Sequence, residues 1–235
     1  MQNTKGKLFL IPSVIAEESI NTIPVSVVNA LEKTDHFIVE NIKTARRFIK
    51  SVLRSKNIDN CVFEEMNKHD DYVFNVDFLA VTSEGKNIGL LSEAGMPCIA
   101  DPGNKVVSAA HERHIEVVPL AGPSSILLAL VGSGLNGQQF TFNGYLPIEP
   151  RERISKLQQM EGLAKKGHTQ IFMDTPFRNQ KLLDEIMKSC HPNTLLCIAC
   201  DLTGKSQYIK TLTISAWRKQ KPDLHKKPAV FLFGI

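Results

Sequence analysis

Two segments of this sequence combine glycine, proline, serine and acidic residues in a pattern that could bind a ligand. The first reads SEAGMPCIADPG (92–103), and the second reads PLAGPSS (119–125). Each follows a short apolar run and precedes a stretch of helical periodicity, so each is predicted to join a buried strand to a helix. Glycine lets the backbone approach a ligand closely, and helix N-termini offer N–H groups without an intrahelical partner. Two tight turns without a ligand would carry the same residues.

The segments around these two loops alternate short apolar runs with helical stretches, which is typical of an α/β protein. Ligands bind beyond the carboxyl ends of strands in open α/β sheets, so the loops are well placed for a site. The expected strands cover residues 7–12, 36–40, 87–92, 115–120, 140–147, 169–173, 195–200, 208–214 and 228–235. The expected helices include 42–56, 104–114, an apolar helix after Ser125, 152–166 and 177–189.

A proline-rich stretch, Pro147-Ile-Glu-Pro150, is the best linker candidate, because proline disfavours the continuation of a helix or strand. We therefore expect two α/β domains, 1–147 and 148–235. A chain of 235 residues, 43% of them apolar, is long enough to build two cores.

Charge is distributed unevenly along the chain. Residues 1–149 hold 13 Lys and Arg against 17 Asp and Glu, whereas residues 150–235 hold 15 against 7. This asymmetry favours an anionic partner for the C-terminal part, although a solubilising surface would look the same. The predicted helix 42–56 is also basic on one side, and it could contact phosphate or simply face solvent.

Two short motifs are misleading. Gly132-Ser-Gly134-Leu-Asn-Gly137 matches the dinucleotide-binding pattern, but the helix precedes it and the strand follows, so it is predicted to be a helix C-cap. Cys197-Ile-Ala-Cys200 has the spacing of a zinc pair, but it lies in a predicted strand, where residues three apart point to opposite faces. We predict no metal site. The signatures of serine hydrolases, zinc proteases, P-loop enzymes and kinases are absent from the sequence.

Cellular location is indicated by composition. No apolar run reaches the roughly 18 to 20 residues that a membrane-spanning helix needs, and the apolar stretch before Pro12 is too short for a secretory signal. Five cysteines, an odd number in apolar surroundings, are expected to be reduced thiols. We expect a soluble, cytoplasmic protein without a membrane partner.

Several motifs occurring in order resemble the tetrapyrrole methylase family of S-adenosyl-L-methionine (SAM) dependent methyltransferases. LLSEAGMPCIADPG, VVPLAGPSS and FNGYLP lie at matching intervals, and TQIFMDTPFR and ACDLT continue the likeness. The sequence is most similar to the branch that methylates the ribose 2′-hydroxyl of a cytidine in small-subunit ribosomal RNA, whose loops read S-D-A-G-x-P-x-I-S-D-P-G and P-G-P. The likeness covers most of the chain from residue 87 onward.

The resemblance implies two α/β domains that hold SAM in the cleft between them, usually in a homodimer, and RNA as the substrate. Carried over by position, the cofactor contacts would be Ile15, Ala94, Gly95, Met96, Ile99, Ser124, Ser125, Met173, Asp174 and Ala229. Apolar walls would suit adenine and the thioether, and hydroxyl and backbone groups would suit the ribose and amino-acid ends. For RNA, the phosphate contacts would be Lys43, Arg46, Arg47 and Arg178.

The N-terminal quarter departs from the RNA-methylating branch. PSVIAEE (12–18) stands where that branch has P-T-P-I-G-N-L, and VENIK (39–43) stands where it has A-E-D-T-R. A ribose hydroxyl needs a base or hydrogen-bond acceptor nearby, and Glu40 and Asp201 are the catalytic candidates, unless they are ordinary surface carboxylates. Two alternatives stay open: methylation of a tetrapyrrole precursor, and a SAM-binding module that has lost catalysis.

Overall fold

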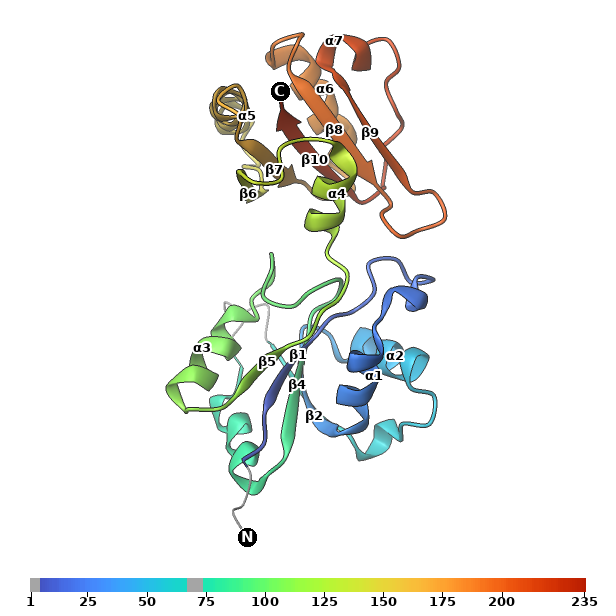
Figure 1. Cartoon of the computed structure of the whole chain (residues 1–235), viewed down its shortest axis with the longest axis vertical. Helices are drawn as coiled ribbons and strands as arrows, with labels where there is room; N and C mark the ends of the chain where they lie inside the picture. Colours follow the sequence, from blue (N-terminus) through green and yellow to red (C-terminus); the bar gives the residue numbers. More distant parts are fainter. Residues whose placement is uncertain (1–4, 67–73) are drawn as a thin grey trace. The chain divides into compact units, whose positions relative to one another are not determined.

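The computed structural model describes residues 5–66 and 74–235 and divides the chain into two units. The first unit ends at Ser124, and the second unit begins at Ser125. Each has one five-stranded sheet and its own apolar core (Figure 1).

The first unit is built on a parallel sheet with the strand order β3-β2-β4-β1-β5. Its strands are β1 (Leu8–Ile11), β2 (Thr34–Val39), β3 (Val62–Glu65), β4 (Asn87–Leu91) and β5 (Val117–Pro119). Its helices are α1 (Val25–Glu32), α2 (Ile42–Val52) and α3 (Asn104–Glu112), with 3₁₀ turns η1 (Ile20–Thr22), η2 (Ile58–Asn60) and η4 (Val76–Glu84).

Helices cover both faces of this sheet, which explains why its central strands are apolar on both sides. On one face, α3 and η4 pack on residues such as Leu8 and Leu90. On the other face, α1 and α2 pack on Phe37 and Leu91 (Figure 1). Consecutive residues Leu90 and Leu91 therefore lie in different clusters, because side chains alternate along a strand.

The predicted basic helix forms as α2 and ends at Val52, earlier than expected. The Asn41 side chain caps it by accepting a hydrogen bond from the Thr44 N–H at 3.1 Å. Ala45 and Ile49 are buried as predicted, together with Phe48. The helix is thus anchored by one apolar side and presents its cations on the other.

The second unit is built on a mixed sheet with the order β6-β7-β10-β8-β9, in which only β6 and β7 pair in parallel. Its strands are β6 (Phe140–Tyr145), β7 (Thr169–Met173), β8 (Leu195–Cys200), β9 (Tyr208–Thr213) and β10 (Ala229–Gly234). Its helices are α4 (Ser125–Ser133), α5 (Pro150–Ala164), α6 (Asn179–Ser189) and α7 (Ile214–Trp217).

Three of these helices, α5, α6 and α7, share the main core of the second unit with one face of the sheet. Trp217 is fully buried there and donates its indole N–H to the Leu196 carbonyl at 2.8 Å. Helix α4 packs on the opposite face: the Thr211 hydroxyl donates to the Ser133 carbonyl at 2.6 Å, whereas the next residue, Leu212, packs on the main core.

The division of the chain differs from the predicted boundary at residue 147, because the two units separate at Ser124 and Ser125. Helix α4 and strand β6 pack with the second sheet, although they precede the prolines. Pro150 instead starts α5, where Glu149 caps the helix by accepting from the Glu152 N–H at 2.8 Å. Proline is favoured in the first turn of a helix, and this explains why the motif resembled a linker.

The glycine motif after α4 is a helix end, as predicted. Helix α4 ends at Ser133, and Gly134 follows with a φ of +72°. This left-handed conformation is the usual way in which glycine terminates a helix.

The cysteine pair lies in β8, also as predicted. Cys200 belongs to the main core of the second unit, and Cys197 lies outside that cluster, although both are buried. Among the described residues, no helix has both the length and the apolar character required to cross a membrane.

Candidate functional site

Loops that follow three neighbouring strands of the first unit are tied together. After β1, the Ser13 N–H donates to the Gly95 carbonyl at 2.9 Å, and the Ser13 hydroxyl donates to the Ser92 carbonyl at 2.6 Å. The segment after β1 is therefore attached to the loop after β4, which we name the first glycine loop (residues 92–103).

The loop after β5, which we name the second glycine loop (residues 119–125), packs against the same place. Gly95 has a φ of +73°, and a Cβ there would lie 3.3 Å from the Pro123 carbonyl oxygen and 4.0 Å from Ile15 Cγ1. A Cβ on Gly122 would lie 2.3 Å from Pro12 Cβ. The two glycine loops thus lie side by side, and glycine is required at both contacts.

Asp101 organises the first glycine loop, and sequence reasoning did not single it out. Its Oδ1 accepts hydrogen bonds from the N–H groups of Cys98 at 2.8 Å and Gly103 at 2.7 Å. In this turn Cys98 and Ala100 have positive φ values of 69° and 62°, which non-glycine residues rarely adopt. The Asp101-Pro-Gly103 sequence was a signal for this turn, since Asp side chains often accept hydrogen bonds from nearby backbone.

Burial changes the acidity of two side chains in this loop. It raises the pKa of the Cys98 thiol to about 11, so that Cys98 is a neutral thiol at physiological pH. Burial also raises the pKa of Asp101, and the two hydrogen bonds that its carboxylate accepts from the backbone act in the opposite direction. The Asp101 Oδ2 atom is buried and has no hydrogen-bond partner among the described residues.

The sequence-predicted cofactor residues of the first unit gather at this carboxyl edge of the sheet. Gly95 contacts the second glycine loop, and Ile15 lies at the same contact. Ile99 is 41% exposed, which is unusual for a large apolar side chain in a tightly bonded loop. The others on or beside the two loops are Ala94, Met96 and the buried Ser124.

Glu40 lies at the same edge, directly after β2. Its Oε1 accepts a hydrogen bond from the backbone N–H of Glu93, in the first glycine loop, at 3.0 Å. Strands β2 and β4 are parallel neighbours, so the residues that follow them meet. The structure therefore brings one of the two candidate bases to the glycine loops.

In the second unit, another set of predicted residues shares one edge of the sheet. Met173, the last residue of β7, pairs with Val230 near the start of the antiparallel strand β10. The first residue of β10, Ala229, pairs with Cys200 at the end of β8. Asp174 follows Met173, is buried, and forms an ion pair with Arg178. Ser125 is the first residue of α4.

Asp201, the second candidate base, holds a turn after β8. It has a φ of +50°; its Oδ2 accepts from the Ser206 N–H at 3.0 Å, and its carbonyl accepts from the Gly204 N–H at 2.9 Å. These bonds give the side chain a structural role in the connection to β9. Glu40 and Asp201 belong to different units.

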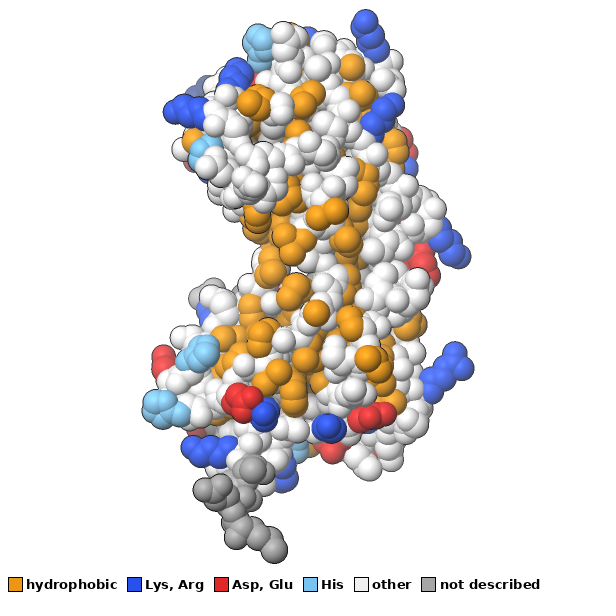
Figure 2. Space-filling view, in the orientation of Figure 1, with side chains coloured by type: hydrophobic (Ala, Val, Ile, Leu, Met, Phe, Trp, Pro, Cys, Tyr) orange, Lys and Arg blue, Asp and Glu red, His pale blue; other side chains and the backbone are white. Residues whose placement is uncertain are grey.

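The cations predicted to contact phosphate include two that are already paired with acidic side chains in the first unit. On α2, Arg46 lies 3.2 Å from Asp59 and Arg47 lies 3.2 Å from Glu17, and Lys43 is exposed. On the face drawn in Figure 2, Lys and Arg side chains are scattered rather than gathered in one patch. Exposed ion pairs are weak, so these arginines can exchange their partners at little cost.

The fold and the loops by themselves define a class of protein. A parallel sheet with adjoining glycine loops at its carboxyl edge is the architecture of a ligand-binding α/β protein. A second, mixed sheet distinguishes this chain from a single doubly wound domain.

Comparison with known families identifies the chain more closely. The family model for tetrapyrrole (corrin/porphyrin) methylases matches residues 19–216. The chain belongs to this family, and it is a methyltransferase that uses SAM. The resemblance inferred from the loop motifs is thereby confirmed, as is the α/β fold class.

Similar curated proteins match nearly the whole chain. A protein of Buchnera aphidicola subsp. Schizaphis graminum named ribosomal RNA small subunit methyltransferase I is 29% identical over 98% of this chain and 78% of that protein. The protein of the same name from Escherichia coli O157:H7 is 28% identical, also over 98% of this chain and 78% of its own length.

Solved structures show the same fold. The crystal structure of the methyltransferase CobJ has a TM-score of 0.63 and 18% identity, and it covers 97% of this chain and 94% of CobJ. The uroporphyrin-III-C-methyltransferase from Thermus thermophilus has a TM-score of 0.58 and 14% identity, over 98% of this chain and 94% of that enzyme.

The residues of the glycine loops fit this cofactor. SAM supplies a methyl group on a positively charged sulfur, which a nucleophile can displace. Gly95 leaves a space that a Cβ would fill, beside a backbone carbonyl and the Ile15 side chain. Ile99 adds exposed apolar surface of the kind that adenine or a thioether covers.

Proposed function

We propose that this methyltransferase acts on RNA and transfers the methyl group to a ribose 2′-hydroxyl of small-subunit ribosomal RNA. One observation carries the proposal: the relatives named ribosomal RNA small subunit methyltransferase I match 98% of the chain, including both units. The likeness is therefore not restricted to the cofactor loops that a whole family shares.

The proposed cofactor contacts fall into two groups, one in the first unit and one in the second. In the first unit, the glycine loops and the segment after β1 supply Ile15, Ala94, Gly95, Met96, Ile99 and Ser124. In the second unit, the contacts are Ser125, Met173, Asp174 and Ala229. The close packing at Gly95 and the shared edge of Met173 and Ala229 support these two groups of residues.

Methyl transfer is an in-line displacement, so the protein has to align the acceptor and exclude water. A ribose hydroxyl is a poor nucleophile until its proton is accepted by a nearby group. Glu40 is the proposed acceptor of that proton, because its carboxylate is hydrogen-bonded to the first glycine loop. Asp201 is the second candidate, although its carboxylate also holds the turn after β8.

The two segments that depart from the RNA-methylating branch are both hydrogen-bonded to the first glycine loop. Ser13, in the altered PSVIAEE segment, is bonded to Gly95, and Glu40, in the altered VENIK segment, is bonded to Glu93. Both segments therefore contribute to the site with the residues that this chain has. This favours an active enzyme over a module that only binds SAM.

We also propose that the protein is a cytoplasmic homodimer. All five cysteines are free thiols, as expected in a reducing compartment. Leu127, Leu128 and Val131 lie on one side of α4 and are 45%, 37% and 83% exposed. A second copy of the chain would cover this apolar side. Light scattering of the purified protein measures its molar mass and thus whether it is a dimer.

A methyl-transfer assay with labelled SAM tests the acceptor. Small-subunit ribosomal RNA from a strain that lacks this protein should become labelled, and primer extension should locate the new methyl group. Label in a tetrapyrrole precursor, with none in RNA, would support the first alternative. Thermal stabilisation by SAM without transfer to either acceptor would support the non-catalytic alternative.

A further inference from the structure

Large apolar side chains are exposed where the two parallel strands of the second sheet end. Tyr145, the last residue of β6, is 55% exposed, and Phe177, in the loop after β7, is 74% exposed. Ile148, in the loop after β6, is also exposed. Strands β6 and β7 are parallel neighbours, and Tyr145 pairs with Met173 at the end of β7. The three side chains therefore extend from one edge of the sheet, which we name the β6–β7 edge (Tyr145, Ile148 and Phe177).

A β-bulge directs Tyr145 away from the core. The register of β6 against β7 shifts between Phe142 and Tyr145, and Gly144, within the shift, has a φ of +68°. Bulges often redirect a side chain in this way. The next residue, Leu146, is buried in the main core of the second unit, so Tyr145 points to the other side of the strand. The exposure of the Tyr145 ring is therefore set by the backbone.

Buried side chains hold the two loops that carry Ile148 and Phe177. Arg153 is buried and donates to the Ile148 carbonyl at 2.7 Å. In the loop after β7, the buried Asp174 forms an ion pair with Arg178, and Phe177 lies between them in the chain. Exposed apolar side chains that a fixed backbone holds in water mark a contact surface, because a partner that covers them removes them from water.

Aromatic rings distinguish this edge from the other exposed apolar surface of the second unit. Of the described Phe, Tyr and Trp residues, the exposed ones are Phe140, Tyr145 and Phe177, and all three lie on β6 or just after β7. Helix α4, which we propose to bind a second copy of the chain, exposes aliphatic side chains and has no charged residue. Flat rings offer faces on which unpaired nucleobases stack, and aliphatic side chains do not.

Cations border the β6–β7 edge. Arg151 follows Ile148 by three residues and Lys181 follows Phe177 by four, and both cations are exposed on the first turns of their helices, α5 and α6. An open groove of about 490 Å³ continues from this edge along α5, and it is lined by Pro147, Arg151, Glu152, Ser155, Lys156 and Gln159. The groove has two cations against one carboxylate, and residues 150–235 hold 15 Lys and Arg against 7 Asp and Glu. This charge favours an anionic chain as the partner.

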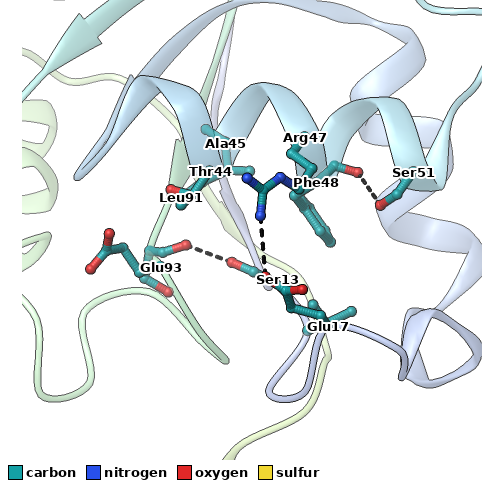
Figure 3. Close-up of a pocket in the computed structure, with 11 residues that line it drawn as sticks. Ser13, Glu17, Thr44, Ala45, Arg47, Phe48, Ser51, Leu91 and Glu93 are labelled. Atoms are coloured by element: carbon teal, nitrogen blue, oxygen red, sulfur yellow. Dashed lines mark hydrogen bonds and ion pairs between the residues drawn. The ribbon is translucent and has the colours of Figure 1, made fainter.

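The pocket of the first unit has no exposed ring. It has a volume of about 210 Å³ and lies between α2, the segment after β1 and the end of β4 (Figure 3). Phe48, the one aromatic residue among the described residues that line it, is buried in the core. Its one cation, Arg47, lies 3.2 Å from Glu17, and Glu93 adds a second carboxylate. Both the rings and the charge therefore favour the β6–β7 edge as a surface for unpaired bases.

We propose that the β6–β7 edge binds single-stranded RNA, and that bases next to the methylated nucleotide stack on Tyr145 and Phe177. Arg151 and Lys181 contact the phosphates of that strand. The inference rests on the proposed RNA methyltransferase function. Because Tyr145 pairs with Met173, a proposed cofactor contact, a base stacked on Tyr145 lies beside the proposed cofactor site. Stacking tolerates any base, so this surface holds the strand without selecting its sequence.

Fluorescence titration of the full-length protein tests the stacking without turnover. The probe is a short single-stranded oligouridine that contains one 2-aminopurine, a base whose fluorescence is quenched when it stacks. The wild-type protein should bind this RNA and quench the probe. Phe177→Leu and Tyr145→Leu should each weaken binding about tenfold and reduce the quenching, because leucine keeps an apolar side chain but has no ring. Tyr145→Phe, which keeps the ring, should bind like the wild-type protein.

Phe140→Leu is the matched control. Phe140 is also an exposed ring of β6, but it is the first residue of the strand, at the end opposite Tyr145. This variant should change neither affinity nor quenching. No binding of the RNA, binding without quenching, or equal binding by the wild-type protein and both leucine variants would overturn the proposal. A lower molar mass of the leucine variants in light scattering, with unchanged RNA binding, would assign the edge to a second copy of the chain and would also overturn it.

Turnover separates this inference from the proposed function. If the wild-type protein methylates small-subunit ribosomal RNA, Phe177→Leu should raise the KM for that RNA about tenfold and change kcat by less than about twofold, because the ring acts in binding and not in methyl transfer. Methylation with an unchanged KM in this variant would overturn the assignment of the β6–β7 edge alone. If the protein methylates no RNA, the proposed function fails, and quenching that depends on the rings would still show that the edge binds unpaired bases.

Discussion

The two sheets of this protein differ in strand direction, and the difference determines where a ligand site can form. In the first unit all five strands are parallel, so the loops after β1, β2, β4 and β5 meet at one edge. In the second unit, β10 runs against both of its neighbours, so strand ends and strand starts are mixed along each edge. A parallel sheet therefore gathers more loops at one place, and the glycine loops belong to that sheet.

The two units also differ in the polar groups that they bury. Among the described residues up to Ser124, the buried polar side chains are all hydroxyls, whereas the second unit buries Arg153, Glu161 and Asp174. Hydroxyls hold the loops of the first unit, for example at Ser13. In the second unit, charged anchors hold α5 to α6 and to the loop that precedes β8. Variants in the two units should therefore separate ligand binding from structural anchoring.

Removal of a buried anchor should have the largest effect. Arg153 donates from Nε and Nη2 to the Glu185 carboxylate at 2.5 and 2.7 Å, and from Nη1 to the carbonyls of Pro147 and Ile148. Arg153→Ala should destabilise the second unit by about 3–5 kcal/mol, because it leaves Glu185 unpaired in a largely buried position. The fluorescence of Trp217, the only tryptophan, reports unfolding of that unit.

A nearby arginine provides the control for this variant. Arg151 is exposed on the same helix, and Arg151→Ala should leave the free energy of unfolding within about 0.5 kcal/mol of wild type. If both variants unfold like the wild-type protein, the ion pair is not an anchor.

The same ion pair predicts a dependence of stability on pH. The hydrogen bond from Arg153 lowers the pKa of Glu185 below its ordinary value of 4.5. The pair therefore stabilises the folded state above pH 4.5, and this contribution is lost as the pH falls through the lower, folded pKa. Denaturation of wild type and Glu185→Gln from pH 7 to pH 3 should show the stability difference shrinking only at the acidic end.

A side chain at Gly95 should remove cofactor binding while the second unit stays folded. Gly95→Val adds a Cβ at a φ of +73°, beside the Pro123 carbonyl. We expect SAM affinity, measured by calorimetry, to fall by at least about 100-fold, which corresponds to about 2.7 kcal/mol.

A second glycine isolates the effect of backbone strain. Gly134→Ala introduces a side chain at nearly the same angle, +72°, with nothing within 4 Å. Gly134→Ala should destabilise the protein through backbone strain and leave SAM affinity unchanged. Equal affinity of the Gly95→Val variant and the wild-type protein would show that the first glycine loop does not contact the cofactor.

Removal of the Asp101 carboxylate from the first glycine loop should have a moderate effect on SAM affinity. Asp101→Ala removes the acceptor for the N–H groups of Cys98 and Gly103, so the loop should loosen and SAM affinity should fall about tenfold. Asp101→Asn keeps one acceptor oxygen and should restore most of the affinity. Hydrogen exchange at residues 96–103 measures the loosening directly, and unchanged exchange in the alanine variant would contradict this role.

Replacement of an exposed cation of α2 should have the smallest effect. Arg46 forms an exposed ion pair with Asp59, so Arg46→Ala should change stability by less than about 1 kcal/mol. If Arg46 contacts an RNA phosphate, the slope of log K against log salt should become shallower by about one. An unchanged slope would show that Arg46 does not contact an RNA phosphate.

The sequence predicted most elements and missed the contacts between them. Apolar runs such as NIGLL identified the strands, and Gly134 identified the end of α4, because both signals are local. Pro150 was misleading because proline marks a helix start as well as a linker. Asp101 went unnoticed because its importance depends on where two backbone N–H groups lie.

From the sequence alone follow the positions of most strands and helices, although not β3, and the placement of both glycine loops at strand ends. These features depend on side-chain periodicity and turn residues. Only the tertiary structure decided that Ser13 bonds to Gly95, that Glu40 bonds to Glu93, and that Arg47 lies against Glu17 over a pocket. These contacts join residues far apart in the chain, and the pairing of strands, which no local pattern encodes, brings them together.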